Sequence, residues 1–187
     1  MYTLLRPLTR FALASLAAIA LSAPSQAVPV TYTGGGFDIP VGGINPGDGV
    51  GTLVVPDLGP VTNFLNVQIT ISTPHTYRDD LTARLTSPTG TVVALFPFLG
   101  GSSDWLAGTF TLVDGGGAPI PHTGSEGEVV DWAPGTYDIQ GGSYASFLGV
   151  QGDGLWTLTV NDRYFDDSGS ASSWSITLDQ DAAAAGV

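Results

Sequence analysis

The chain has 187 residues with 17 aspartates and glutamates, five basic residues and no cysteine, and its formal net charge is −12 at pH 7. The lack of cysteine excludes a small scaffold held together by disulfides, and a chain of this length can bury a core of its own. The negative charge disfavours nucleic acid and anionic membrane surfaces as partners and favours cations.

The first 27 residues have the plan of a signal peptide. Two arginines precede an apolar run over residues 11–23, which is too short for an anchored membrane span. Ser25 and Ala27 supply the small residues that a signal peptidase requires before its cleavage site. We therefore expect a secreted chain that begins near Val28 and carries three arginines against 17 carboxylates, a net charge of −14.

The remaining sequence predicts an all-β fold, because short runs alternate apolar and polar residues and no stretch keeps the 3.6-residue period of a helix. The predicted strands are 66–72, 81–86, 91–96, 108–114, 155–160 and 172–178, with weaker candidates at 30–34, 51–55 and 136–139. Alternate side chains, such as Val67, Ile69 and Ile71, should face the core. Short strands joined by tight turns favour a jelly-roll-like antiparallel β-sandwich.

The chain is expected to form one domain. Residues 28–59 supply its first strands, residues 60–178 form the main sandwich, and residues 179–187 form a frayed tail. Residues 115–135 are rich in turn-forming residues and show little alternation, which predicts a long surface loop.

The stretch from His75 to Thr91 gathers a histidine, two aspartates and a serine, the residue types of acyl-transfer catalysis. A nucleophile needs a structure that presents it, usually a sharp strand-to-helix turn, and the sequence shows none. Ser143 stands in a weak match to such a motif, but no helix is predicted after it. We therefore interpret His75 as a loop residue whose ring bonds to neighbouring backbone, and we predict no catalytic residue.

Calcium is the metal that the sequence favours. Zinc is disfavoured because the two histidines lie far apart and no cysteine joins them. Calcium prefers carboxylate and carbonyl oxygens on turns. The candidate ligands flank predicted strands: Asp79, Asp80, Asp162, Asp166 and Asp167. The alternative is that these aspartates cap turns through hydrogen bonds to backbone N–H groups.

The four tryptophans fall into two pairs. Trp156 and Trp174 are in phase with apolar strand neighbours, which predicts that both lie in the core. Trp105 and Trp132 lie in predicted loops, where an exposed indole could stack on the sugar rings of a polysaccharide. A loop aromatic more often packs over one end of a sandwich, so we favour that interpretation for both indoles and keep sugar binding as the alternative.

Two motifs stand far apart in the sequence. The first contains His75, Asp80-Leu81 and the turn Ser-Pro-Thr-Gly-Thr at residues 87–91. The second comprises Phe147, Gly149, Gly154, Trp156, Leu158, Val160, Asp162, Gly169 and Trp174. Together they resemble the P domain, or Homo B domain, of kexin-like and furin-like proprotein convertases and their bacterial relatives.

This resemblance covers about residues 60–178 and implies a jelly-roll β-sandwich. In that family the module follows a subtilisin-like protease domain, packs against it, stabilises it and contributes no catalytic residue. The Asp, His and Ser motifs of subtilisin-like enzymes are absent from this sequence. The resemblance therefore implies a secreted, non-catalytic module that binds or stabilises another protein, with Asp80 and Asp162 fixing loops directly or through an ion. The alternatives are an accessory that acts in trans on a separate serine protease and a polysaccharide-binding module.

Overall fold

The computed structural model describes residues 27–40, 46–98, 102–121 and 130–181, so the predicted signal peptide lies almost wholly outside the described residues. Within these ranges the chain forms nine strands: β1 (Ala27–Ile39), β2 (Gly47–Val55), β3 (Phe64–Thr73), β4 (Leu81–Thr86), β5 (Val92–Phe96), β6 (Gly108–Val113), β7 (Gly135–Asp138), β8 (Gly154–Asp162) and β9 (Gly169–Asp181). Two short 3₁₀ helices, η2 (Arg78–Asp80) and η3 (Tyr144–Phe147), complete the described secondary structure.

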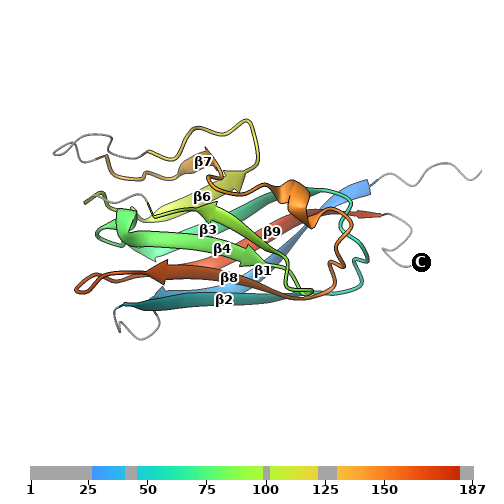
Figure 1. The fold of residues 1–187 in the computed structure, drawn as a ribbon, viewed down its shortest axis with the longest axis horizontal. Coiled ribbons are helices and arrows are strands. Elements are labelled where there is room, and N and C mark those ends of the chain that lie inside the picture. Colours follow the sequence, from blue (N-terminus) through green and yellow to red (C-terminus); the bar gives the residue numbers. More distant parts are fainter. Residues whose placement is uncertain (1–26, 41–45, 99–101, 122–129, 182–187) are drawn as a thin grey trace, which may run out of the picture.

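The strands form two sheets packed face to face (Figure 1). The five-stranded sheet has the order β1-β9-β3-β6-β7 and the four-stranded sheet the order β2-β8-β4-β5. Neighbouring strands are antiparallel except β6 and β7, which are parallel. The chain passes from one sheet to the other at most of its connections, which is the pattern of a jelly roll. The predicted fold class is confirmed.

Every predicted strand overlaps an observed strand, with bounds that differ by a few residues at most, because alternation places one side chain in two on the core face. In β3, Val67 and Ile69 are 0% exposed and Ile71 is 2% exposed. The same alternation buries the predicted inward residues of β4, β8 and β9, which are Leu81, Ala83, Leu85, Trp156, Leu158, Val160, Trp174, Ile176 and Leu178. The two inner faces thus form one apolar core.

Trp105 and Trp132 are both 0% exposed, so neither indole is available to stack on a sugar. Their backbones form isolated bridges that join residues 75, 105 and 132. The two rings stack with centroids 5.0 Å apart, and Phe96 and Phe110 pack against them. The interpretation that both indoles pack over one end of the sandwich is therefore confirmed, and the alternative of a polysaccharide platform at these two tryptophans is wrong, because the loops that carry them turn inward and close the core.

Strand β9 continues through Asp181, so the expected frayed tail is wrong for residues 179–181. Asp181 pairs with Ala27, and this antiparallel ladder with β1 runs as far as Gly169 and Ile39. The first and last described residues therefore lie side by side, at the right-hand end of the sandwich in Figure 1.

No helix in the described ranges has both the length and the apolar character needed to cross a membrane.

The indole of Trp174 fixes how closely β1 approaches β2. Gly34 lies directly opposite Trp174 in the ladder, and a Cβ atom there would come within 2.5 Å of the indole Nε1 and 2.7 Å of the Thr52 carbonyl oxygen. Gly51 on β2 is equally tight, since its Cβ would come within 2.6 Å of the same nitrogen. The neighbouring Gly35 faces open space, with nothing within 4 Å of a Cβ.

We expect Gly34→Ala to lower the free energy of unfolding by about 1–3 kcal/mol, because the added methyl overpacks the space beside Trp174. Gly35→Ala, one residue away on the same strand, is the matched control and should change it by less than about 0.5 kcal/mol. Urea unfolding followed by tryptophan fluorescence measures both. Equal effects of the two substitutions would contradict this account of the packing.

Candidate functional site

His75 lies between β3 and β4 and is 0% exposed. Its backbone N–H donates to the carbonyl of Trp105 at 3.0 Å, and its own carbonyl accepts from the Trp105 N–H at 2.8 Å. Its ring atom Nε2 faces the Asp162 carboxylate at 3.3 Å. The expectation that the ring bonds to neighbouring backbone is wrong, because the partner of the ring is a side chain 87 residues further along the chain.

Asp162 ends β8 and is also 0% exposed. One carboxylate oxygen faces His75, and the other accepts a hydrogen bond from the Tyr164 N–H at 3.2 Å. Asp162 also stands opposite Leu81 in the ladder between β8 and β4. The pair therefore joins the segment that leads into β4 to the turn that follows β8.

Arg78 and Asp79 form a second buried polar pair in η2. The guanidinium of Arg78 lies over the Trp132 ring, with its Cζ atom 5.6 Å from the ring centroid. Burial lowers the pKa of Arg78, and the nearby Asp79 carboxylate opposes that shift. Asp79 thus faces the interior and neutralises a buried cation.

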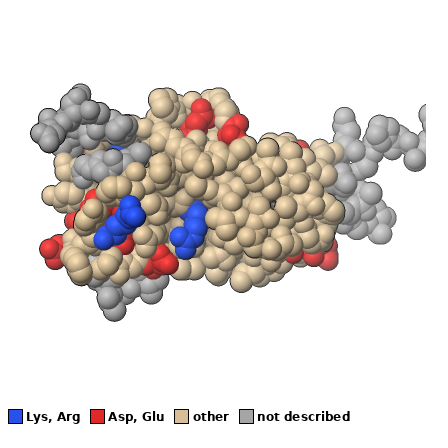
Figure 2. Space-filling model, viewed as in Figure 1, with Lys and Arg blue, Asp and Glu red and all other residues tan. Residues whose placement is uncertain are grey.

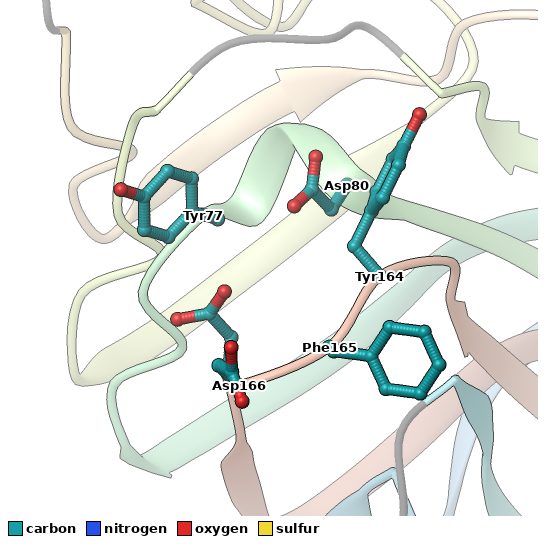
Figure 3. Close-up of a pocket in the computed structure, with 6 residues that line it drawn as sticks. Tyr77, Asp80, Tyr164, Phe165 and Asp166 are labelled. Carbon is teal, nitrogen blue, oxygen red and sulfur yellow. The ribbon is translucent and has the colours of Figure 1, made fainter.

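A pocket of about 400 Å³ opens between η2 and the β8–β9 turn (Figure 3). It is lined by Tyr77, Asp80, Tyr164, Phe165, Asp166 and Asp167. In Figure 3 the carboxylate of Asp80 lies between the rings of Tyr77 and Tyr164, whereas the ring of Phe165 points away from them. Two wall residues, Tyr77 and Asp166, have left-handed backbone with φ of 64° and 78°, which is uncommon for residues other than glycine.

The carboxyl of Asp80 lies in an unfavourable environment for negative charge. Burial, followed by the neighbouring carboxylates of Asp162, Asp167 and Asp79, raises the pKa of Asp80 from 3.8 to about 6. Thr76 donates a hydrogen bond to Asp167 on the same side of the molecule. Repulsion between carboxylates is therefore built into this end of the sandwich.

The five aspartates predicted to bind calcium gather at one end of the molecule, but they do not form one metal site. Asp79 is paired with Arg78, and both oxygens of Asp162 already have partners. Across residues 27–40, 46–98, 102–121 and 130–181, no three or more histidine or acidic side chains are grouped so that they could hold a metal ion.

Ser143 does not join the histidine. It precedes η3, where its Oγ accepts from the Ala145 N–H and donates to Asp114. Figure 1 places η3 at the end of the sandwich opposite η2. Ser143 is therefore a helix cap.

The aromatic walls of the pocket were not predicted from the sequence. Tyr77, Tyr164 and Phe165 are 45%, 52% and 66% exposed. A signal was present at residues 164 and 165, because two consecutive aromatic residues within a turn have no strand face on which both can be buried.

The raised pKa of Asp80 makes stability depend on pH. Below pH 3.8 the Asp80 carboxyl is protonated in both the folded and the unfolded chain. Because the folded chain holds this proton more tightly, the proton stabilises the fold, and this stabilisation is lost as the pH rises through about 6 and the carboxyl ionises in an unfavourable place. We expect Asp80→Asn to raise the melting temperature at pH 8 and to leave it nearly unchanged at pH 4. Asp38→Asn, at an exposed position on β1, is the matched control, and the same gain there would contradict the assignment to Asp80.

Calcium binding at this end of the molecule stays a prediction. The calcium hypothesis predicts that about 1–10 mM CaCl₂ raises the melting temperature by mass action, and that Asp162→Ala and Asp80→Asn each remove that rise. The turn-capping interpretation predicts no rise. Calorimetry of the three proteins with and without the ion separates the two, with Asp38→Asn again as the control.

The comparison with known proteins rests on the region that contains this site. None of the curated proteins matches the chain. The family model described as the proprotein convertase P-domain matches residues 64–178, which include η2, the His75–Asp162 pair and the β8–β9 turn. The chain therefore belongs to the proprotein convertase P-domain family.

Proposed function

We propose that this chain is a secreted accessory module that binds or stabilises another protein and performs no catalysis itself. Membership of the P-domain family supports an accessory role, because P domains of convertases pack against a subtilisin-like protease domain. That family also works largely outside the cell, which supports the expectation of export.

The observation that carries the proposal is the complete burial of His75 and Asp162, both 0% exposed. A general base must come within hydrogen-bond reach of the proton that it removes, and a ring shielded from solvent cannot reach a substrate. The Nε2 atom of His75 is occupied by Asp162, and its backbone is tied to Trp105. His75 and Asp162 therefore have the residue types of a catalytic pair, but in this proposal they serve to connect parts of the fold.

Within this proposal we favour a protein partner over a polysaccharide. The indoles that would have formed a sugar platform are buried in the core. The form of the proposal closest to the family is an accessory that acts in trans on a separate subtilisin-like protease.

The proposal predicts that the purified chain hydrolyses neither peptide nor ester substrates above background, and that it retains a specific protein from the secreted fraction of its source organism. A subtilisin-like protease among the retained proteins would support action in trans. Mass spectrometry of the retained fraction and steady-state hydrolysis assays measure the two parts.

An unrelated β-sandwich of similar negative charge serves as the control bait, and identical proteins on both baits would argue against a specific partner. Turnover that disappears in His75→Ala, in a variant whose circular dichroism shows native structure, would overturn the non-catalytic role. Ser143→Ala provides a second variant if the first does not fold.

A further inference from the structure

The outer face of the four-stranded sheet carries a groove of about 540 Å³. Its residues come from β4, β5, β8 and the segments that follow β5 and β8. The side chains that matter here are Arg84, Ala94, Phe98 and Arg163, with Val92 at one margin. This surface is separate from the aspartate pocket, although Phe98 on this side packs against Tyr164 on the other with centroids 6.0 Å apart.

The groove collects all the exposed positive charge of the described chain. The sequence has no lysine, and its arginines beyond residue 27 are Arg78, Arg84 and Arg163. Arg78 is buried against Asp79, whereas Arg84 and Arg163 are exposed and both line the groove. Figure 2 shows basic side chains gathered on this face of the molecule, with an extended surface that carries no charged side chain beside them.

Neither arginine forms a close ion pair with a carboxylate of the described chain. Arg84 has one acidic neighbour, Asp48, at 4.0 Å, and the two side chains are 47% and 45% exposed. An exposed pair at that separation contributes little. The guanidinium of Arg163 lies over the Phe98 ring at 4.8 Å, which orients the cation but leaves its N–H donors without an acidic partner among the described residues.

The register of the sheet explains why Arg84 stands in the groove. Ala83 and Leu85 point into the core, so Arg84 points outward, and it lies between Thr159 on β8 and Ala94 on β5. The apolar part of the surface lies beside it, where Val92 is 53% exposed and Phe98 is half-buried. The result is an apolar surface flanked by two cations.

We propose that this groove docks an acidic segment of a partner protein, with carboxylates on Arg84 and Arg163 and apolar side chains against Ala94, Val92 and Phe98. Charge complementarity argues for an acidic occupant, because the rest of the described surface carries only acidic charges and repels such a segment. The inference rests on the proposed function and narrows the chemistry of the partner.

A dense polyanion fits this surface poorly. Nucleic acids, sulfated polysaccharides and anionic membranes need several cations to replace their counterions, and the face offers two within a strongly negative chain. The apolar floor instead favours a segment that carries hydrophobic side chains as well as carboxylates.

The test uses the purified ¹⁵N-labelled chain and a short peptide of alternating glutamate and leucine, with the lysine–leucine and glutamine–leucine peptides as comparisons. We expect amide shifts at Arg84, Ala94 and Phe98 with the glutamate peptide alone, weakening as salt is added. Arg84→Gln and Arg163→Gln should each weaken binding about threefold, and the double variant about tenfold. Gln68→Glu, an exposed position on the other sheet, makes the same change in charge as one Arg→Gln substitution and should leave the affinity unchanged.

The inference is overturned if the glutamate peptide does not bind, if Gln68→Glu weakens binding as much as Arg84→Gln, or if the shifts map to Tyr77 and Asp80. Tighter binding of heparin, or a concentration-dependent spectrum without peptide that the double variant abolishes, would overturn it in favour of a polyanion or a second copy of the chain. If the double variant still retains the partner protein, the groove is not the docking site, and the proposed accessory function is unaffected.

Discussion

The contact between His75 and Asp162 is the constraint on which this end of the molecule depends. Both side chains are shielded from solvent, so removing Asp162 would leave the Nε2 atom of His75 without its partner, and removing His75 would leave one buried carboxylate oxygen of Asp162 without one. The contact ties the segment before β4 to the end of β8 and thereby sets η2 against the β8–β9 turn. The pocket walls that carry Asp80 and Tyr164 exist because these two segments are held together.

The same contact gives a physical meaning to the sequence motifs of the family. The motif around residue 75 and the motif that ends β8 lie far apart in sequence, yet they meet in space at this pair. Glycine is required at two positions where these motif segments pack against each other. A Cβ on Gly169 would come within 2.9 Å of the His75 Cβ, and one on Gly154 would come within 2.9 Å of Pro88 in the tight turn. The motif residues thus describe how the chain closes on itself, and no chemical reaction is needed to explain their types.

Where the chain alternates, the sequence was enough to predict the strands and their inward faces, as in β3, because a two-residue period has one geometric meaning. The interior position of Trp105 and Trp132 was not predictable in this way, since isolated bridges between loops leave no periodic trace. Clustering of the aspartates was anticipated. The partners of Asp79 and Asp162 were not anticipated, because a sequence does not state that the adjacent Arg78 turns inward with Asp79, or that His75, 87 residues away, faces the Asp162 carboxylate.

Because Ala27 pairs with Asp181, the described chain enters and leaves the sandwich at one pole, whereas η2 and the β8–β9 turn form the other pole (Figure 1). A support attached at residue 27 or residue 181 would therefore lie at the pole opposite the aspartate pocket. Immobilisation on a sensor chip at this shared pole should leave the opposite pole, with the aspartate pocket, free for ligands.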